Sequence, residues 1–497
     1  MGIVKKQVYK NTLVTYAGMA VAYVNTILLF PFFATNEQYG LYNLLISLSV
    51  LYSLIASLGI PGIVAKYFPF YRTDDGSHNG FVHWTAIIAA AGFIILTVLL
   101  IVFKPFILSK YIDTSPLFVK YYYYLIPLSL FTILFNFLEV TGRVVYRTIF
   151  SSFLRDVLIR LITTFLLIML AEHWISFHDF IALYVASWGL VALILLISLY
   201  ATKKFSYRLG ATKFNLIKKK EILYYGFYTT ISLAIYVLLQ KVDVIMLSSM
   251  VGDAIQGVYS WYFNIAIAIS VPAQALSRTT YQLVADSWKS KNLKNIEDIY
   301  VKTSIIQMVI GCLIFILIII NKNNLLSLVH DKIKAEQFNV VILIGLGFLV
   351  DITGGLNSYI IVTSHKYRII TMVTILSSIF CVGLNYLLIP KYGGMGAAFA
   401  YLVTMIVLNF CTWLYTKIRF NMQPFSYKHV LVIVIAFISY MVGKFLWRAP
   451  NLYFDMLLRT GVTALLYIGF AYWLKISEDL NEKVKSLFLK WIYFKRT

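Results

Sequence analysis

The chain has 497 residues, of which 60% are hydrophobic and 13% charged, and its mean hydropathy is +0.79. Soluble domains carry about 25% charged residues, so the composition excludes a soluble fold. Continuous apolar blocks, without the strand alternation of outer-membrane barrels, predict an all-α integral membrane protein. The three cysteines all lie inside apolar blocks, which argues against a disulfide framework or a zinc site.

A hydrocarbon core of ~30 Å requires about 20 apolar residues per helix. Blocks with few charges predict fourteen transmembrane helices. They cover residues 11–33, 40–63, 81–103, 118–138, 150–171, 179–200, 222–247, 257–276, 301–320, 338–362, 369–388, 394–416, 428–447 and 456–474.

The net charge of +22 raises the question of a nucleic-acid partner. An even number of spans puts both termini on one side, and the loops of that side hold 29 of the 43 Lys and Arg residues, against 7 on the other. This asymmetry is the positive-inside signal. It predicts cytoplasmic N- and C-termini in the cell (inner) membrane and removes the case for nucleic-acid binding.

The loops are too short to house an enzyme. The longest outer loop is 321–337, and no Gly-rich phosphate-binding loop is present. We therefore predict neither an ATPase nor a glycan-processing enzyme.

Two similar segments indicate an internal repeat. Gly40-Leu41-Tyr42 and Gly257-Val258-Tyr259 each open a helix on the predicted outer side, 217 residues apart. Six helices in each half, entered from the same side, predict two lobes related by a pseudo-two-fold axis along the membrane normal. The expected division is an N-terminal lobe over 1–210, a C-terminal lobe over 211–420, and two further helices with a basic tail over 421–497.

Three segments resemble a known family. Residues 32–72, 240–261 and 384–402 are similar to the first hairpin, the seventh helix with its turn, and the eleventh-to-twelfth helix turn of polysaccharide-unit (Wzx-type, oligosaccharide) flippases. These belong to the multidrug/oligosaccharidyl-lipid/polysaccharide (MOP) exporter superfamily. The resemblance extends over the whole chain.

The resemblance implies alternating-access transport of an undecaprenyl-diphosphate-linked oligosaccharide to the outer leaflet, for surface polysaccharide. Its implied partners are the lipid-linked oligosaccharide, membrane lipids and the polysaccharide polymerase machinery. It implies no cofactor beyond a coupling Na⁺ or H⁺. The branch that flips the cell-wall precursor tends to carry arginines in its first two helices, whereas residues 11–36 and 38–65 here hold no basic residue. This favours a surface-polysaccharide unit.

The fifth span carries Arg155, Asp156 and Arg160. At 1.5 Å per residue, Arg160 lies about 15 Å deep, near the midplane, where a charge costs at least ~2.5–3.5 kcal/mol. Asp156 and Arg160 are four residues apart and are expected to pair, leaving Arg155 without a partner in its own helix. Either the two arginines hold a diphosphate through bidentate hydrogen bonds, or the span begins near Val157 and Arg155 lies among the headgroups.

The seventh span carries Lys241 and Asp243 on different faces near its outer end. Asp243 is a candidate for cation coupling, together with Asn385 of the eleventh span, because carboxylate and amide oxygens suit a hard cation. Lys241 is a candidate for the substrate cavity. Alternatively, Asp243 makes a structural pair, Lys241 extends to the interface, and Asn385 only bonds to a neighbouring helix.

Other charges allow two interpretations each. Asp351, before Gly354-Gly355 in the tenth span, is either a second coupling candidate or an acid satisfied by another helix. Arg143 is expected to pair with Glu139 at the inner end of the fourth span, with a place at the mouth of the substrate cavity as the functional alternative. Arg459 lies near a helix end and is expected to extend to the headgroups.

Two other function classes stay open. A cation-coupled drug or small-molecule antiporter of the same superfamily is the main alternative, although a mid-membrane arginine disfavours a cationic substrate. A membrane glycan polymerase or ligase is the second, and the absence of a large outer loop argues against it.

Overall fold

A computed structural model describes residues 2–73, 78–144, 148–201, 216–328, 335–366, 368–478 and 481–482. Throughout these ranges the regular structure is helical and no strand is formed. Inside a bilayer a helix satisfies its own backbone hydrogen bonds, which irregular or open-edged structure does not. The predicted all-α class is confirmed.

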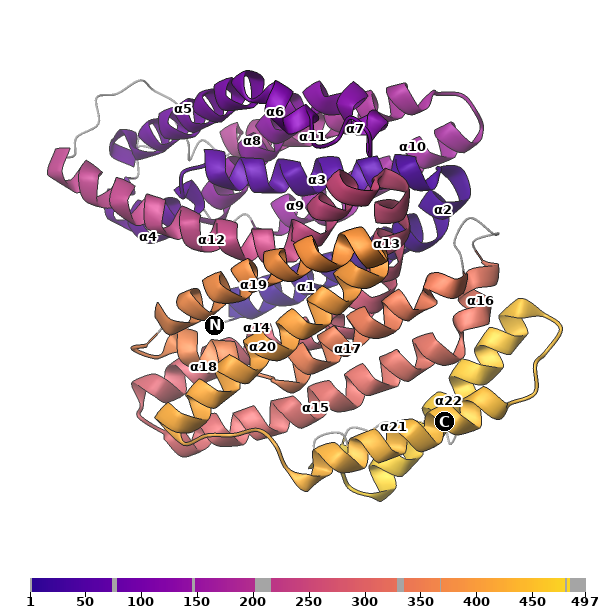
Figure 1. The fold of residues 1–497 in the computed structure, drawn as a ribbon. Helices are drawn as coiled ribbons and strands as arrows, with labels where there is room; N and C mark the ends of the chain where they lie inside the picture. The colour runs from indigo at the N-terminus through magenta and orange to yellow at the C-terminus, as the bar shows by residue number, and fades with distance from the viewer. Residues whose placement is uncertain are drawn as a thin grey trace, which may run out of the picture. The chain divides into compact units, whose positions relative to one another are not determined.

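The helices follow one another in chain order, joined mostly by short turns (Figure 1). The first half contains α1 Gly2–Tyr23, α2 Phe30–Phe33, α3 Asn36–Ala56, α4 Ile60–Tyr71, α5 Phe81–Val102, α6 Lys104–Leu108, α7 Pro116–Tyr121, α8 Leu125–Val144, α9 Thr148–Phe153, α10 Ile159–Ala171, α11 Phe177–Tyr200 and α12 Leu216–Val251. The second half contains α13 Asp253–Ala266, α14 Val271–Lys289, α15 Leu293–Ile320, α16 Lys322–Ser327, α17 Asn339–Thr353, α18 Asn357–Thr363, α19 Arg368–Tyr392, α20 Gly394–Phe420, α21 Tyr427–Phe445 and α22 Leu452–Trp473.

Every predicted span coincides with helical structure, but not every one is a single apolar helix. Within the described ranges, eleven helices are long and apolar enough to cross a membrane, or twelve if the bent pair α17 and α18 forms one span. The fifth segment, 148–171, carries three charges, and the eighth, 253–289, is rich in polar residues; neither is among the eleven. The count of fourteen therefore stays a prediction.

The predicted second span, 40–63, is interrupted. Helix α3 ends at Ala56, and α4 begins at Ile60 after Leu58 and Gly59, both of which have positive φ. The predicted tenth span is likewise broken, with a bend of 45° between α17 and α18 at the Gly354-Gly355 pair.

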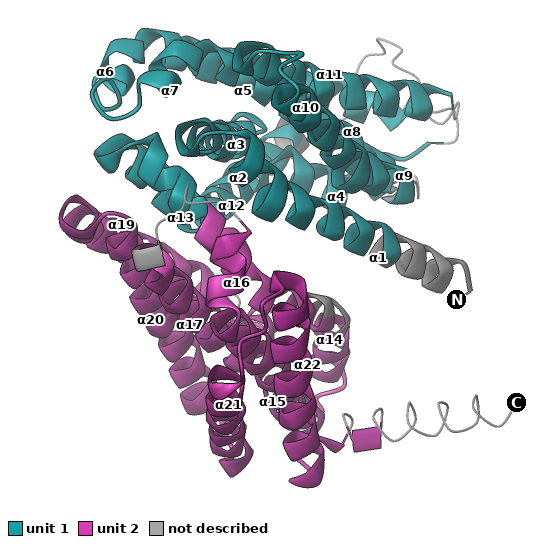
Figure 2. Ribbon diagram, turned by 90° about the vertical axis from the view of Figure 1, so that its right-hand side faces the viewer, with its two compact units in different colours: residues 1–260 teal, residues 261–497 magenta. Residues whose placement is uncertain are grey.

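The chain forms two compact units, residues 1–260 and 261–497 (Figure 2). In the first unit α3 packs against α8 and α12, and α11 packs against α8 and α10. In the second unit α20 packs against α17 and α19, while α21 and α22 pack against α15. The predicted lobe boundaries at residues 210 and 420 were based on the sequence repeat, whereas the two compact units are defined by packing contacts. The predicted boundaries therefore remain a prediction.

The two Gly-x-Tyr segments of the predicted repeat meet within the first unit. A methyl group added at Gly40 would clash with the carbonyl oxygen of Asp253, and one added at Gly257 would clash with the carbonyl oxygen of Asn36. Each glycine thus contacts the residue four positions before the other. The starts of α3 and α13 cross in reciprocal contact that leaves no space for a side chain.

A buried ion pair fixes the last helix of the second unit. Arg459 Nε donates to Asp455 Oδ2 at 2.8 Å, and the other guanidinium nitrogens donate to the carbonyl oxygens of Gly443 and Leu446. Asp455 also accepts from Asn324. The expectation that Arg459 extends to the headgroups is wrong, because an acid one turn earlier and two carbonyls at the end of α21 hold it inside.

We expect Gly257→Ala to destabilise the protein by about 1–3 kcal/mol, because the added methyl group would overpack a backbone contact. The measurement is the thermal unfolding midpoint of the purified chain in detergent. Gly383→Ala in α19 is the matched control, since nothing lies within 4 Å of the added methyl group; helix propensity predicts a neutral or slightly stabilising change there. Equal midpoints for the two variants would contradict the close crossing.

Candidate functional site

Four charged side chains of the first unit form one ion-pair network. Arg155 Nη1 donates to both carboxylate oxygens of Glu139 at 2.8 Å, and its Nε donates to Asp156 Oδ1 at 3.1 Å. Arg143 Nη2 donates to Glu139 Oε1 at 2.8 Å. Two acids and two arginines balance, so these four groups carry no net charge.

The network confirms one predicted pair and corrects another. Glu139 and Arg143 pair as expected, one helical turn apart. Asp156 pairs with Arg155 and not with Arg160, so the prediction that Arg155 lacks a partner in its own helix is wrong. Arg155 has a second acidic partner in Glu139 of α8. Residues Leu154–Leu158 form a π-helical turn. Such a turn changes the angular offset of the residues that follow it, so the spacing of four no longer aligns Asp156 with Arg160.

Arg160 lies beside this ion-pair network but forms no ion pair within it. Its Nη1 atom is buried and finds no hydrogen-bond partner in the described part of the chain. Asp156 and Arg155 are charged neighbours of Arg160 with opposite sign, and Tyr42 and Tyr184 belong to the same surroundings. Together with the balanced network, Arg160 gives the cluster an excess of one positive charge.

The backbone around Arg160 is held by the first helix. Helix α1 continues into a π-helical segment, Val24–Leu29, which places the buried Asn25 against α10. Asn25 Nδ2 donates to the carbonyl oxygen of Arg160 at 2.8 Å, and Thr164 Oγ1 donates to Asn25 Oδ1 at 2.7 Å. The position of Arg160 is therefore set by hydrogen bonds that leave its guanidinium group uncommitted.

Aromatic side chains line the same region. The rings of Tyr42 and Tyr184 lie 5.0 Å apart between centroids, Tyr42 also contacts Phe30 at 4.5 Å, and Phe180 stacks with Tyr184 at 6.5 Å. Tyr42 is only half-buried, unlike the others. Tyrosine combines an apolar ring with a hydroxyl group, so Tyr42 offers both kinds of contact beside the excess charge.

The other candidates of the first unit lie together on α12. Asp243 is buried and accepts a hydrogen bond from the Tyr259 hydroxyl at 2.7 Å. Lys241 lies two residues earlier and forms no ion pair with any described residue. The predicted lack of pairing between Lys241 and Asp243 agrees with this arrangement.

The candidates of the second unit lie on separate helices. Asp351 on α17 accepts from Asn409 Nδ2 of α20 at 3.3 Å. Asn385 is fully buried on α19, and its Nδ2 contacts Cys381 Sγ at 3.5 Å. The proposed partnership of Asn385 with Asp243 stays a prediction, because the two residues belong to different compact units.

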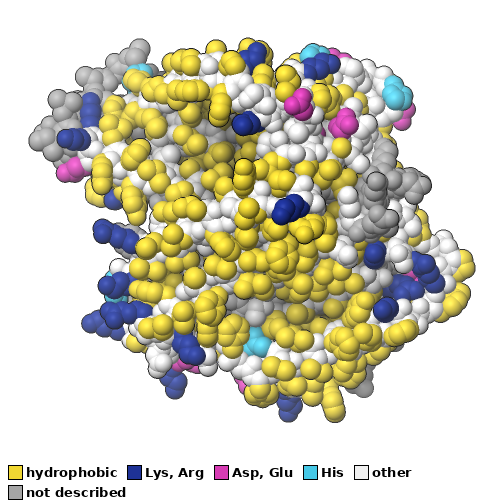
Figure 3. All heavy atoms as spheres, in the orientation of Figure 1, with side chains coloured by type: hydrophobic (Ala, Val, Ile, Leu, Met, Phe, Trp, Pro, Cys, Tyr) yellow, Lys and Arg dark blue, Asp and Glu magenta, His cyan; other side chains and the backbone are white. Residues whose placement is uncertain are grey.

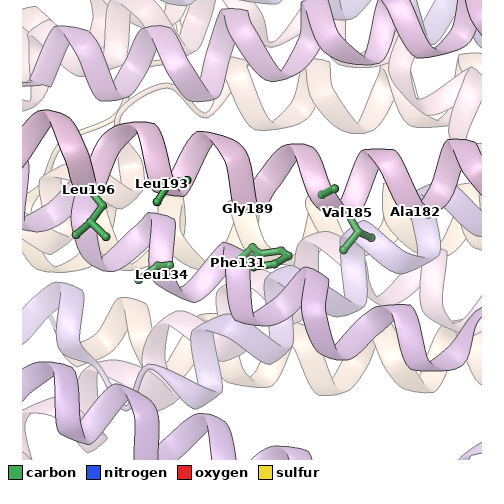
Figure 4. Close-up of a pocket in the computed structure, with 8 residues that line it drawn as sticks. Phe131, Leu134, Ala182, Val185, Gly189, Leu193 and Leu196 are labelled. Carbon is green, nitrogen blue, oxygen red and sulfur yellow. The ribbon is translucent and has the colours of Figure 1, made fainter.

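The first unit also has a cavity with an entirely apolar lining, in contrast to the charged cluster around Arg160. The cavity between α8 and α11, of about 490 Å³, is lined by Phe131, Leu134, Leu193, Leu196 and four smaller apolar residues (Figure 4). None of these lining residues can hold a charge. This cavity therefore offers no group that could bind an anion or a cation, unlike the cluster around Arg160.

Comparison with known proteins gives the family. The family described as polysaccharide biosynthesis protein matches residues 4–281, which is more than half of the chain, and the MatE family matches residues 229–387. The chain belongs to the polysaccharide biosynthesis protein family.

The chain is similar to the capsular polysaccharide biosynthesis protein CapF of Staphylococcus aureus. The two are 24% identical over 209 residues, which make up 42% of this chain and 52% of CapF. The chain thus spans about half the length of that relative.

Solved structures show the fold. The lipid II flippase MurJ in an inward closed conformation is similar over 94% of this chain and 98% of MurJ, with a TM-score of 0.76 and 12% identity. An inward-facing multidrug resistance MATE transporter of the MOP superfamily covers 82% of this chain and 94% of its own, with a TM-score of 0.61 and 13% identity. This polysaccharide biosynthesis family member therefore has the fold of the MurJ flippase and of MATE transporters of the MOP superfamily.

The arginine cluster contains residues that the sequence did not identify as functional. Asn25 and Tyr184 carried no signal beyond a polar group inside an apolar block, and Tyr42 was noted only as part of the Gly-x-Tyr repeat. Glu139 was identified as a partner of Arg143 but not of Arg155. The sequence paired Asp156 with the wrong arginine, because the π-helical turn that aligns Asp156 with Arg155 does not follow from residue spacing.

Two substitutions with the same side-chain chemistry are expected to act oppositely on stability. Arg155→Met removes the shared partner of Glu139 and Asp156. Breaking a buried pair costs about 3–5 kcal/mol, and we expect a loss toward the lower end of this range because the Arg155 side chain is 36% exposed. Arg160→Met removes a buried donor that lacks a partner, so we expect no loss, or a gain. The measurement is the thermal midpoint in detergent. Arg143→Met is the control, since its side chain is 53% exposed and such pairs contribute about 0–1 kcal/mol. Greater damage from Arg160→Met than from Arg155→Met would contradict the assignment of the uncommitted charge.

Proposed function

We propose that this protein flips an undecaprenyl-diphosphate-linked oligosaccharide repeat unit from the cytoplasmic to the outer leaflet, for surface polysaccharide synthesis. The observation that carries the proposal is the buried, unpartnered guanidinium nitrogen of Arg160. An uncommitted arginine inside a membrane span is costly unless a ligand uses it. A diphosphate is the matching ligand, because guanidinium groups bind phosphate oxygens bidentately.

The relatives support a glycan-lipid substrate. The family is one of polysaccharide biosynthesis, CapF is named for capsular polysaccharide, and MurJ, which shares the fold, is a lipid II flippase. The half-buried ring of Tyr42 beside Arg160 suits a sugar next to a diphosphate. These points favour a sugar-diphosphate lipid over a simple anion.

In this mechanism Arg160 binds the diphosphate and the two halves of the transporter open alternately to the two leaflets. Arg155 and Arg143 hold the acidic groups that would otherwise neutralise Arg160, and Lys241 contributes further positive charge to the cavity. The protein works in the cell inner membrane with both termini in the cytoplasm, and it delivers its substrate to the polysaccharide polymerase machinery.

Cation coupling through Asp243 is the second part of the proposal. Asp243 is buried and hydrogen-bonded to Tyr259, and buried carboxylates in membrane spans are the usual sites of proton or Na⁺ coupling. Asp351 and Asn385 are further candidates for the same role.

We expect Asp243→Asn to abolish the effect of an imposed Na⁺ or H⁺ gradient on transport in proteoliposomes, while the uncoupled rate remains. Asparagine keeps an oxygen that accepts from Tyr259, so folding is preserved. Asp113→Asn, at an exposed position, is the matched control. A wild-type gradient effect in Asp243→Asn would exclude this residue from coupling.

The second candidate function is a cation-coupled drug or small-molecule antiporter. The MatE match to residues 229–387 and the MATE-like fold favour it. A positive excess charge within the cluster disfavours a cationic drug, since like charges repel at low dielectric. We therefore rank it second.

Lipid-linked oligosaccharides in cells with and without the protein test the proposal directly. We expect mass spectrometry to find complete units accumulating on the cytoplasmic leaflet and surface polymer to be lost in its absence. Arg160→Ala is expected to reduce export by about tenfold or more, since a charge-assisted hydrogen bond contributes ≈ 1.5–3 kcal/mol, with normal protein levels in the membrane.

Lys120→Ala removes a charge from an exposed position of the same unit and serves as the control. Normal export by Arg160→Ala would contradict the role of this residue. An unchanged lipid pool with altered tolerance to cationic dyes would establish the antiporter instead.

A further inference from the structure

A second cluster of cations lines a cavity of the second unit, far along the chain from the arginine cluster. The cavity, of about 530 Å³, lies among the ends of α15, α17 and α21, the short helix α16, and α22. Its charged lining residues are Lys322, Lys444, Arg448, Arg459 and Asp455. In Figure 3, Lys and Arg side chains gather at the lower right of the face, over α16 and α22.

Only one of the four cations is neutralised by the acid. Arg459 and Asp455 are both buried and form the ion pair described above. Lys322, Lys444 and Arg448 form no ion pair with any residue in the described ranges. Lys322 Nζ lies 5.3 Å from the centre of the Phe338 ring, and Lys444 and Arg448 are exposed. The cavity therefore carries an excess of three positive charges.

The positive-inside rule does not account for these cations. Lys322 and Arg448 lie in loops of the side predicted to be outer, which holds only 7 of the 43 basic residues. On a side that is depleted of Lys and Arg, the gathering of several around one cavity requires a separate cause. A bound anion supplies one.

The cavity continues into an apolar groove. The groove, of about 840 Å³, shares Ile319, Ile342 and Tyr440 with the cationic cavity and runs between α15, α17, α20 and α21. Along α15 it extends from Met308 to Ile319, which is about 17 Å at 1.5 Å per residue and about half of a ~30 Å hydrocarbon core. A cationic end joined to an apolar groove matches a lipid with a phosphate headgroup, not a free anion.

We propose that this cavity binds the phosphate headgroup of a membrane lipid from the outer leaflet, with its hydrocarbon chain along the adjoining groove. Lys322, Lys444 and Arg448 hold the phosphate, and the Arg459–Asp455 pair fixes the wall of the cavity without contributing net charge. The site lies outside the arginine cluster and does not depend on the proposed flipping activity. A diacyl phospholipid and a polyprenyl phosphate share this chemistry.

The test is lipid binding to the purified full chain, measured by native mass spectrometry and by the thermal midpoint. Phosphatidylglycerol, undecaprenyl phosphate, phosphatidylcholine and inorganic phosphate are added separately. We expect stabilisation by one or both of the first two lipids, and the tighter of them identifies the source of the phosphate. The triple variant Lys322→Gln, Lys444→Gln and Arg448→Gln should bind that lipid at least tenfold more weakly, since each cation near a lipid phosphate contributes about fivefold.

The matched control is the triple variant Lys104→Gln, Lys110→Gln and Lys391→Gln. It removes the same charge from the same predicted side but from residues that do not line the cavity, and it should retain wild-type affinity within about twofold. Equal loss in both triple variants, or no loss in the first, would overturn the site. Full stabilisation by inorganic phosphate alone, or equal binding of phosphatidylcholine, would overturn the assignment to a phosphate-bearing anionic lipid.

Discussion

Charge inside an apolar medium has to be compensated locally, and this requirement organises much of the polar structure of this protein. Removing an ion from water costs several kcal/mol even after relaxation, so each charged side chain in a span needs an opposite charge, a set of dipoles or a ligand. Arg155 meets the requirement with Glu139 and Asp156, and Arg459 meets it with Asp455 and two carbonyl oxygens. The Arg155–Glu139 pair also joins two helical segments, and Arg459 links α22 to the end of α21 through the two carbonyl oxygens.

Arg160 is an exception to this requirement, and the exception distinguishes a candidate binding residue from residues that only stabilise the fold. Its backbone is fixed by Asn25 while its guanidinium group is left without a complete set of partners. A group that served only stability would show the opposite arrangement. The same contrast holds in the second unit, where Arg459 is fully used by the protein and the neighbouring Lys322, Lys444 and Arg448 are not. In both units a satisfied ion pair thus lies beside cations that form no ion pair with a described residue, and these cations are the ones proposed to bind phosphate groups.

The sequence was sufficient for properties that depend on composition and local spacing. Apolar blocks predicted the helical class and the positions of the helical segments, and a separation of four residues predicted the Glu139–Arg143 pair. It was insufficient where the backbone departs from the ideal period. The π-helical turn at Leu154–Leu158 redirected Asp156 to Arg155, and the interruption between α3 and α4 divided a predicted span. Arg459 shows a third limit, because its burial depends on carbonyl groups of α21 that are distant in sequence.

The fifth helical segment has a consequence for how the protein is made. Arg155, Asp156 and Arg160 make this segment less hydrophobic than a helix that inserts into the bilayer by itself. The isolated segment is therefore expected to partition poorly into lipid as it emerges from the ribosome. Its compensating acid, Glu139, resides in the preceding helix, and its backbone partner, Asn25, in the first. From these contacts we expect the entry of the fifth segment into the bilayer to depend on helices that are synthesised earlier. The charges proposed to bind an anion thus also make the insertion of the first half of the chain dependent on contacts between its helices.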